Sequence, residues 1–456
     1  MQRKRIYRMP NTGKLKPSRY NVMIDLPAGR QLVFNSVTAA LAEIDEETLP
    51  RFLRLLKSPD SIQSDSDTEL LEQMKYAHFV CPAECDEVVE QKNRNEVQRR
   101  SHTTFALTIA PTLACNFRCG YCFQNSNPVR MTSETIEALI KFCEQRLPGS
   151  GNFMVTWFGG EPTLYLGTVI ELHSRLMALC EKHAVKPVGS SMITNGYLLD
   201  GAMAKRLKEV GIEEVQVTID GPPETHDSRR KLTNGRGTFE RIVANLEESS
   251  RILSVIVRIN VDTDNTNAPL EVVDLLDKRG LLPNVNIYFA PVNPAKGACA
   301  DAGGRCLGAE EFSLLQARLY RELVERGHRR IEYPQIAHGG YCGAGNDHSF
   351  VVAPNGLLFK CWEELSLNAD DAIGDIFGNP PAPIQQKNLD RYRNNDPFAH
   401  AACRECEILP LCLGGCPNAA NNRPDNKHEN CSPWKFNLRE MLTLRYLCNT
   451  QQEVTG

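Results

Sequence analysis

The chain has 456 residues, enough for more than one hydrophobic core, because single cores stop growing at roughly 250 to 300 residues. Charged residues make up 24% and the formal net charge is −4, which gives no electrostatic reason to expect nucleic acid as a partner. The basic N-terminal segment lacks the apolar run of a signal peptide, and no run of roughly eighteen apolar residues indicates a membrane span. We therefore expect a cytoplasmic, globular protein of two or three domains.

The first hundred residues are predicted to form a small α+β domain with a charged linker at its end. Three segments indicate a β-hairpin running into short helices: RYNVMIDL (19–26), GRQLVFN (29–35) and TAALAEID (38–45). Two later segments have the apolar period of amphipathic helices: ETLPRFLRLLKS (47–58) and TELLEQMKYAHFV (68–80). Residues 85–101 are rich in charge and are predicted to be a linker.

Between Thr104 and Phe289, β-rich segments alternate with amphipathic helical segments. The six predicted strands are FALTIA (105–110), FMVTWF (153–158), GSSMI (189–193), EEVQVTI (213–219), LSVIVRIN (253–260) and VNIYFA (285–290). The predicted helices lie near 132–147, 168–183, 201–210, 237–250, 270–279 and 309–326. This alternation indicates an α/β fold with a parallel sheet, either curled as a partial barrel or open and doubly wound. We assign residues 101–308 to this domain and residues 309–456, which are rich in cysteine, to another.

Four short motifs directly follow the first four predicted strands: CNFRCGYC (115–122), GGEP (159–162), TNG (194–196) and DGP (220–222). In parallel α/β folds the loops after the strands converge at one edge, where ligands bind. TNG and DGP taken singly are typical of plain turns. Their recurrence at one edge predicts a single converging site.

Cys115, Cys119 and Cys122 offer three thiols, with no further Cys or His close by in the sequence. The chain has 17 cysteines, an odd number that cannot all pair, and in a reducing compartment such groups are typical of metal sites. Zinc and iron–sulfur clusters usually take four protein ligands in structural sites, whereas a four-iron cluster held by three thiolates leaves one iron open. A zinc fragment or a redox disulfide is the alternative.

The motif resembles the CxxxCxΦC signature of the radical S-adenosylmethionine (radical SAM) enzymes, in which Φ is aromatic. Cys115, Cys119, Tyr121 and Cys122 fill it at every position. The resemblance implies a partial (β/α)6 TIM-type barrel and a [4Fe-4S] cluster that binds S-adenosyl-L-methionine. Reductive cleavage of that cofactor yields a 5′-deoxyadenosyl radical, which abstracts a substrate hydrogen. A reductant such as flavodoxin or ferredoxin is implied as a partner.

The same resemblance assigns cofactor-binding roles at the other motifs. The expected residues are Tyr121, near the adenine; Gly159, Gly160 and Glu161, beside the methionine ammonium; Ser191, Thr194 and Asn195, at the methionine carboxylate and ribose; and Arg258, as a cation for the carboxylate. For Arg258 a salt bridge at the rim is an equally good interpretation.

A second set of cysteines lies in the last third of the chain. Its spacing resembles the SPASM extension of radical SAM enzymes, which carries two auxiliary [4Fe-4S] clusters, with zinc ribbons as the alternative. The resemblance implies that one auxiliary cluster is ligated by Cys403, Cys406, Cys412 and Cys431.

The resemblance assigns Cys342, Cys361 and Cys416 to the other auxiliary cluster. Fully ligated relatives carry a further cysteine six residues before the first of these, and here that position is Ile336. Either this cluster has an open iron that could bind a substrate group such as a thiolate, or its fourth ligand comes from elsewhere. The candidates are Cys299, Cys306 and His338.

SPASM-bearing enzymes typically modify peptides or proteins, so the resemblance implies a precursor peptide as substrate and partner. The pattern of residues 1–100 resembles the small winged-helix-like domain that captures leader peptides of ribosomally made natural products (RiPPs). We expect residues 18–35 to be the edge that accepts the leader as an extra strand. A domain that only packs on the barrel is the alternative.

We therefore expect a peptide maturase that forms a thioether or carbon–carbon cross-link. An anaerobic sulfatase maturase, which forms formylglycine, is the alternative; that family has an Asp general base where this chain has Trp362 followed by Glu363. A non-catalytic iron–sulfur adaptor is a third hypothesis, against which the intact GGEP argues. No general base is identified, and the possible carboxylates are Asp220, Asp262, Glu363 and Glu364, with Asp220 and Glu363 retained as catalytic candidates.

Overall fold

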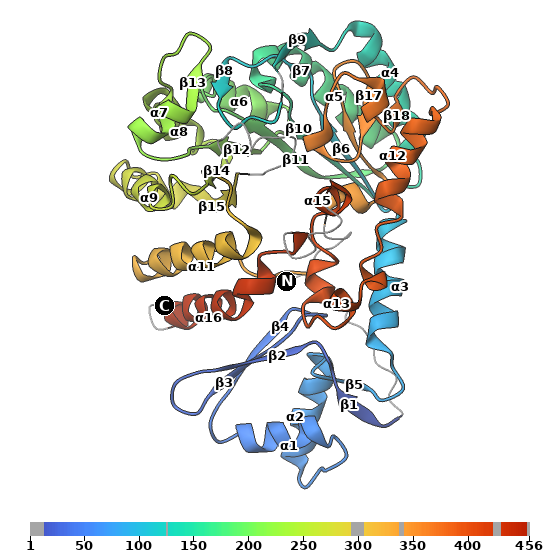
Figure 1. Ribbon diagram of the computed structural model, residues 1–456, viewed down its shortest axis with the longest axis vertical. Helices are drawn as coiled ribbons and strands as arrows, with labels where there is room; N and C mark the ends of the chain where they lie inside the picture. The colour runs from blue at the N-terminus through green and yellow to red at the C-terminus, as the bar shows by residue number, and fades with distance from the viewer. Residues whose placement is uncertain (1–12, 125, 293–304, 337–341, 423–429, 454–456) are drawn as a thin grey trace.

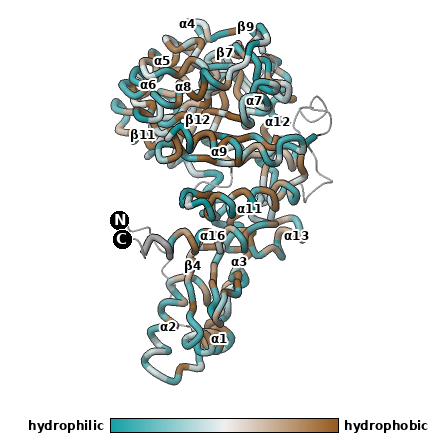
Figure 2. The backbone as a smooth tube through the Cα atoms, turned by 90° about the vertical axis from the view of Figure 1, so that its left-hand side faces the viewer, coloured by the Kyte–Doolittle hydropathy of each residue, from teal (hydrophilic) through white to brown (hydrophobic). Residues whose placement is uncertain are grey.

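Figure 1 shows an elongated molecule with a large sheet at one end and a small α+β unit at the other. Helices α11 (Ala309–Glu325) and α16 (Trp434–Glu453) lie between them, and the view turned by 90° in Figure 2 shows the same order. This computed structural model describes residues 13–124, 126–292, 305–336, 342–422 and 430–453. Over these ranges, no helix combines the length and the apolar character needed to cross a membrane.

The large sheet has nine strands in the order β15-β14-β12-β11-β10-β6-β16-β17-β18. Seven are parallel, and six of these correspond to the predicted strands: β6 (Thr104–Ile109), β10 (Asn152–Trp157), β11 (Lys186–Thr194), β12 (Glu214–Thr218), β14 (Ser254–Val261) and β15 (Val285–Pro291). Between them lie α4 (Ser133–Arg146), α5 (Leu166–Lys182), α6 (Gly201–Glu209), α7 (Pro223–Arg229), α8 (Phe239–Ser249) and α9 (Ala268–Lys278). The predicted α/β class is confirmed, and the closure into a partial barrel stays a prediction.

Side chains between the sheet and its helices form the main hydrophobic core. Buried and half-buried residues alternate along β6, where Phe105, Leu107 and Ile109 are at most 2% exposed. Val169 and Leu172 of α5 are fully buried in the same core. Burying each such side chain is worth roughly 1.5–3 kcal/mol. The core therefore fixes the carboxyl ends of the strands, where the predicted motifs lie.

Three strands in the cysteine-rich region extend the sheet beyond β6. β16 (Ser349–Val352) pairs parallel with β6, and β17 (Leu357–Phe359) and β18 (Gly374–Asp375) continue antiparallel. The sequence does not predict these strands, because strands of four residues or fewer leave almost no periodic pattern of apolar residues. The sheet therefore crosses the predicted domain boundary at residue 308.

The remaining cysteine-rich region consists of short helices and one long helix. Its elements are η4 (Gly343–Gly345), η5 (Trp362–Glu364), η6 (Ala369–Asp371), α12 (Pro383–Arg393), η7 (Pro397–Ala399), α13 (Ala401–Arg404), α14 (Leu409–Cys412), α15 (Pro417–Asn422) and α16. Met441 and Leu444 of α16 join the main core, whereas Leu438 and Leu442 contact the N-terminal sheet. Helix α16 thus connects the two ends of the molecule.

The N-terminal unit contains an antiparallel sheet in the order β2-β3-β4 and a separate pair, β1-β5. Its elements are β1 (Leu15–Pro17), β2 (Asn21–Asp25), β3 (Gln31–Asn35), β4 (Ala40–Ile44), α1 (Leu49–Lys57), α2 (Asp65–Tyr76) and β5 (Val80–Pro82). One sheet face, with Val33 and Ile44, packs on α1 and α2; the other, with Val22 and Phe34, packs on α14 and α16. Because β3 is the central strand, the expectation that residues 18–35 form an open edge is wrong for its second half.

Residues 87–99, within the segment predicted to be a charged linker, form a helix. Helix α3 (Glu87–Arg99) begins at Asp86, whose side chain accepts hydrogen bonds from the N–H groups of Val88 and Val89. At its other end the Arg99 guanidinium donates to four backbone carbonyls of the cysteine-rich region: those of Gly345, Tyr392, Arg393 and Asn395. Helix α3 therefore connects the N-terminal unit to that region (Figure 1).

Candidate active site and metal centres

The first cysteine motif lies on a loop after β6 that is supported by a small antiparallel pair. Strand β8 (Phe117–Cys119) pairs with β13 (Arg230–Leu232), so that Cys119 lies opposite Arg230. Cys115, Cys119 and Cys122 line one cavity of about 200 Å³ at the carboxyl ends of the parallel strands. The structure thus brings the three predicted thiols to one cavity.

Most of the predicted cofactor-binding residues line the same cavity: Tyr121, Gly159, Gly160, Thr194, Asn195 and Arg258. Ser191 is not among its lining residues and instead shares a 3.0 Å hydrogen bond with Thr156 on the neighbouring strand. Of the two catalytic candidates, Glu363 lines the cavity and Asp220 does not. Three of the four motifs therefore contribute to one cavity, namely CNFRCGYC, GGEP and TNG, whereas no residue of DGP (220–222) lines it.

The two glycines of GGEP allow their loop to lie directly against the cysteine loop. A Cβ atom on Gly159 would lie 2.4 Å from the carbonyl oxygen of Thr112, and one on Gly160 would lie 2.2 Å from that of Ala114. The Gly160 N–H donates to Thr112 at 3.0 Å, and the Glu161 N–H donates to Ala114 at 2.8 Å. Glycine is required at both positions because the two loops lie too close together for a Cβ atom, whether or not a ligand is bound.

Glu161 is not among the residues that line the cavity. Its carboxylate is 1% exposed and caps η1 (Pro162–Tyr165) by accepting from the Thr163 N–H and hydroxyl. It also accepts from the Thr194 hydroxyl at 2.6 Å and the Asn195 N–H at 2.7 Å. Burial raises the pKa of Glu161, and these hydrogen bonds oppose that shift. Its side chain therefore connects the GGEP and TNG loops.

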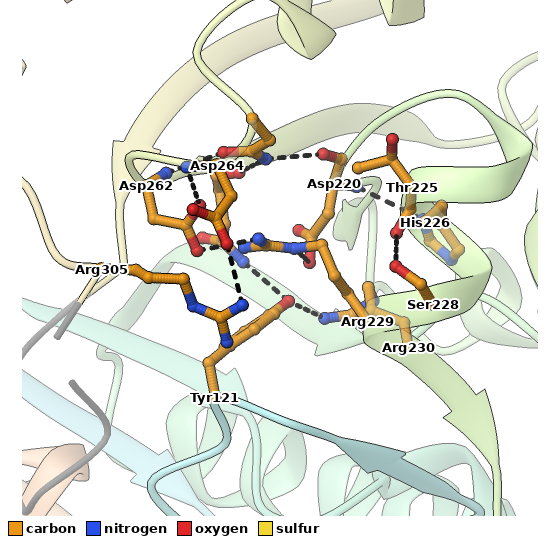
Figure 3. A network of polar contacts seen from close by, with 12 residues as sticks. Tyr121, Asp220, Thr225, His226, Ser228, Arg229, Arg230, Asp262, Asp264 and Arg305 are labelled. Atoms are coloured by element: carbon orange, nitrogen blue, oxygen red, sulfur yellow. Dashed lines mark hydrogen bonds and ion pairs between the residues drawn. The ribbon is translucent and has the colours of Figure 1, made fainter. Parts of the chain in front are cut away.

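Tyr121 is held by a network of polar side chains from several strand ends (Figure 3). Its hydroxyl accepts from Arg230 at 2.6 Å and from Asn260 at 3.1 Å. Arg229 lies 5.2 Å from the centre of the Tyr121 ring and pairs with Asp220 and Asp262. Asp220 is fully buried in this network, which makes it a structural group here and not a residue of the cavity surface.

Sequence reasoning missed several residues that line the cavity: Gln216, Thr218, Arg230 and Asn260. Arg230 comes from β13, which reaches Cys119 only through pairing of two short strands. Gln216 and Thr218 lie on β12, and Asn260 lies on β14; the sequence predicts strands in both segments but assigns none of these three residues to a site. Polar residues near the ends of apolar strands were the available signal for these three.

The residues around this cavity fit a polar small molecule that carries a hydrogen-bond acceptor, beside a thiolate-bound cluster. Arg230 is 7% exposed, lines the cavity, and has a buried Nε without a hydrogen-bond partner among the described residues. Such a donor calls for an acceptor on a ligand. Burial raises the pKa of Cys115 to about 12 and of Cys119 to about 11. Both values describe thiols without a metal, and thiolate ligands are deprotonated when a metal binds.

Single-ion sites and four-iron clusters differ in how far apart their protein ligands lie. In the described part of the chain, no three His, Cys, Asp or Glu side chains lie close enough to hold one metal ion. Zinc bonds of about 2.3 Å would bring sulfur atoms to within about 3.8 Å of each other. Each thiolate of a four-iron cluster binds a different iron, so its ligands lie further apart.

Four of the later cysteines gather at the junction with the N-terminal unit. Cys403, Cys406, Cys412 and Cys431 line a second cavity, of about 250 Å³. The Lys435 ammonium lies 3.6 Å from the sulfur of Cys406. The loop after α14 turns back through Gly415, where a Cβ atom would lie 1.7 Å from the Asn430 carbonyl oxygen. Glycine is needed there to bring Cys412 and Cys431 together.

The remaining three cysteines also lie near one another. Burial raises the pKa of Cys361, and the negative charges of Glu363, Cys342 and Cys416 raise it further. Cys342 and Cys416 are each affected by Glu363 as well, after burial. The loops that carry these thiols also meet: the Asn418 amide, two residues after Cys416, donates to Glu363, two residues after Cys361, at 2.9 Å, and Cys342 lines one cavity with Gly415 and Pro417.

The candidates for a fourth ligand at these three thiols fare differently. Ile336 lines a groove between the N-terminal sheet and α16 and carries no ligating group. Cys306 takes part in a disulfide, which removes its thiol from the ligand set. Cys299 and His338 lie outside the described residues.

Comparison with known proteins identifies the domain that holds the first motif. Residues 109–287 match the model of the radical SAM superfamily. The chain carries a radical SAM domain. The matched segment includes Cys115, Cys119, Cys122, GGEP and TNG, and its strands β10, β11, β12 and β14, with the start of β15, belong to the large sheet.

Sequence similarity to known maturases continues beyond the radical SAM domain and covers most of the chain. The cysteine-type anaerobic sulfatase-maturating enzyme of Clostridium perfringens is 25% identical over 381 residues, which cover 76% of this chain and 94% of that enzyme. The mycofactocin maturase MftC of Mycolicibacterium smegmatis is 24% identical over 341 residues, which cover 70% and 80%. The solved structure of native anSMEcpe with bound AdoMet and Kp18Cys peptide has a TM-score of 0.57 at 22% identity, covering 76% of this chain and 99% of that one. That structure shows a shared fold.

Proposed function

We propose that this protein is a radical SAM maturase that acts on a peptide and carries two auxiliary clusters. The observation that supports it most is the convergence of Cys115, Cys119 and Cys122 with Gly159 and Asn195 at one cavity. Both relatives described above are maturases. When bound to a three-thiolate [4Fe-4S] cluster, S-adenosylmethionine supplies hydrogen-atom abstraction from the substrate.

The residues of the cavity have distinct roles in this proposal. Cys115, Cys119 and Cys122 hold the cluster and leave one iron for the cofactor. Asn195 and Arg258 offer an amide and a cation for a carboxylate, and an amide also suits a ribose hydroxyl. The contribution of Glu161 is indirect, because its side chain positions the Thr194–Asn195 loop.

The auxiliary clusters are assigned to the two later groups of cysteines. Cys403, Cys406, Cys412 and Cys431 complete one site of four thiolates, and Cys342, Cys361 and Cys416 contribute to the other. An external one-electron donor such as flavodoxin or ferredoxin is proposed as the reductant.

The N-terminal unit is proposed to capture a leader peptide at β4. In an antiparallel ladder, the N–H and C=O groups of successive residues point alternately to one neighbouring strand and to the other side. The hydrogen bond from Leu26 N to Arg30 O shows which residues of β3 bond to β2, and the β3–β4 register then shows which residues of β4 bond to β3. Leu41 and Glu43 then point their backbone groups to the open side. On the other edge, Arg439 of α16 already donates to the Met23 carbonyl. A groove of about 390 Å³ lies beside Leu41, between the sheet and α16.

A sulfatase-maturating activity is the second candidate and has about equal support from the relatives. Both candidates use the same core, so they differ in the peptide and in the residue that accepts the proton lost after hydrogen-atom abstraction. Trp362 packs against Phe158 at the cavity, with ring centres 5.7 Å apart, and Glu363 is the nearest cavity carboxylate in sequence. Trp362 cannot act as a base, so this position favours the cross-linking maturase.

The core proposal is tested with anaerobically reconstituted protein. It should carry about twelve irons, as three four-iron clusters require, and should form 5′-deoxyadenosine from S-adenosylmethionine with a reductant. An iron content near four would remove the auxiliary clusters. Absence of 5′-deoxyadenosine would support a non-catalytic adaptor.

The peptide class is tested by mass spectrometry with two substrates. One is any short peptide encoded beside the gene, and the other is a sulfatase peptide with Cys or Ser. Loss of two hydrogens with retention of sulfur in the first peptide supports cross-linking. Formylglycine in the second supports the sulfatase maturase.

A further inference from the structure

Glu363 lies close to Cys361 and Cys416, which belong to the group of three cysteines with no fourth thiol assigned among the described residues. It belongs to η5, the single turn that begins directly after Cys361, and the Glu364 N–H donates back to the Cys361 carbonyl at 3.1 Å. The amide of Asn418, two residues after Cys416, donates to Oε2 of Glu363 at 2.9 Å. Glu363 is therefore tied to two of the three loops that carry these thiols.

The orientation of Asn418 is fixed independently of Glu363. Asn418 is 3% exposed, and its side-chain oxygen accepts from the Tyr392 hydroxyl at 3.3 Å and from the Asn422 amide at 2.8 Å. Its amide nitrogen therefore points toward Glu363, as a donor to a carboxylate. Such a hydrogen bond is typical of the contacts that orient a ligating carboxylate.

The charges around this group also call for a cation. Cys342 belongs to the same group, because it lines one cavity with Gly415 and Pro417, the two neighbours of Cys416 in the sequence. Three thiols and a carboxylate gathered in a low-dielectric region repel one another once ionised. Iron reverses the sign of that interaction, because thiolate and carboxylate are both ligands for it.

We propose that the carboxylate of Glu363 is the fourth protein ligand of the auxiliary cluster held by Cys342, Cys361 and Cys416. The proposal rests on the auxiliary cluster assigned above and replaces the missing cysteine at Ile336 with an oxygen ligand from another loop. Because Glu363 also lines the cavity of the first motif, the iron that it binds belongs to the side of this cluster nearest the substrate site. One iron would then differ from the other three in ligand type.

The inference is tested by spectroscopy of the reconstituted full-length protein. The Cys119→Ala background removes the signal of the first cluster, so that the reduced protein shows the auxiliary clusters alone. Glu363→Gln keeps the size of the side chain and removes the anionic ligand, and it should shift the EPR g values and the midpoint potential of one auxiliary cluster. Glu363→Cys supplies a thiolate and should shift the same signal to a lower potential.

Glu364→Gln is the matched control, because Glu364 lies in the same turn but pairs with Arg391. It should leave both auxiliary signals in place. Identical spectra for the Glu363→Gln, Glu364→Gln and Glu363→Cys proteins would overturn Glu363 as a ligand and leave the cluster assignment intact. An iron content near eight with the native chain and a single auxiliary signal would instead overturn the cluster itself. In every variant, the signal assigned to the cluster of Cys403, Cys406, Cys412 and Cys431 reports that the region is folded.

Discussion

The first three-cysteine group and the group of Cys342, Cys361 and Cys416 contain the same number of thiols in opposite electrostatic surroundings. Near the first group, the guanidiniums of Arg230 and Arg229 lower the pKa of Cys119 against the larger effect of burial. Near the second, Glu363 raises the pKa of every thiol, also after burial. The first environment suits an anionic group of an incoming ligand.

The comparison shows that a count of cysteines does not decide what occupies the fourth position of a cluster. Glu161 also affects Cys115, but its two oxygens are committed to four hydrogen bonds from Thr163, Thr194 and Asn195. Glu363 instead accepts a hydrogen bond from Asn418, on the loop that carries Cys416. Neighbouring charges and hydrogen bonds therefore distinguish two sites. The open site is that of Cys115, Cys119 and Cys122. The closed site is that of Cys342, Cys361 and Cys416, for which Glu363 is the proposed fourth ligand.

The largest expected effect comes from removing a thiol of the open site. Cys119→Ala should lower 5′-deoxyadenosine formation at least about a thousandfold, well beyond the roughly 10- to 100-fold loss caused by removing a supporting contact of a metal ligand. Chromatography of the reaction products measures it, and iron analysis should show that the later sites remain loaded. Cys85→Ser is the control, because Cys85 belongs to neither group. Undiminished product from Cys119→Ala would break the comparison.

The sequence predicts the thiols, Gly159, Gly160 and Asn195 correctly as parts of one edge, because each follows an apolar strand whose period is strong. It does not predict Arg230, since pairing of two three-residue strands brings it to Cys119. Helix α3 was missed for a related reason. Its C-terminal anchor, Arg99, bonds to carbonyls about 250 to 300 positions away, and no local pattern records such partners.

A second experiment tests the cationic surroundings of the open site. Arg230→Ala removes the 2.6 Å hydrogen bond to the Tyr121 hydroxyl and the buried Nε donor at the cavity. Hydrogen bonds to charged groups are worth about 1.5–3 kcal/mol, so affinity for S-adenosylmethionine should fall roughly 10- to 100-fold. Equilibrium dialysis with the reconstituted protein measures this affinity. Arg236→Ala, at an exposed position, should not change it, and an equal affinity in both variants would contradict the role of Arg230.

A third experiment tests how the closed site is held. Arg99→Ala removes four hydrogen bonds to backbone carbonyls, including that of Gly345 in the turn after Cys342. The local free energy of opening should fall by about 2 kcal/mol, which corresponds to roughly 30-fold faster amide hydrogen exchange in segments 343–349 and 392–397. Arg100→Ala is the matched control, since the Arg100 side chain is 77% exposed. Equal protection in both variants would show that α3 does not support the closed site.

The smallest effect concerns acid stability beside the closed site. His348 is 6% exposed, and its pKa is lowered to about 4 by burial, by His102 and by the charges of Arg146 and Lys360. The folded protein keeps this ring neutral, whereas the unfolded chain takes up its proton near pH 6.5. Stability is therefore lost as the pH falls from about 6.5 toward 4, by roughly 1 kcal/mol at pH 5.5. His348→Gln should reduce the change in urea midpoint between pH 7.5 and pH 5.5, whereas His328→Gln, in the half-exposed turn after α11, should not. An unchanged midpoint difference in the His348 variant would mean that His348 is protonated in the folded protein and that the surroundings of the closed site are less apolar than its burial indicates.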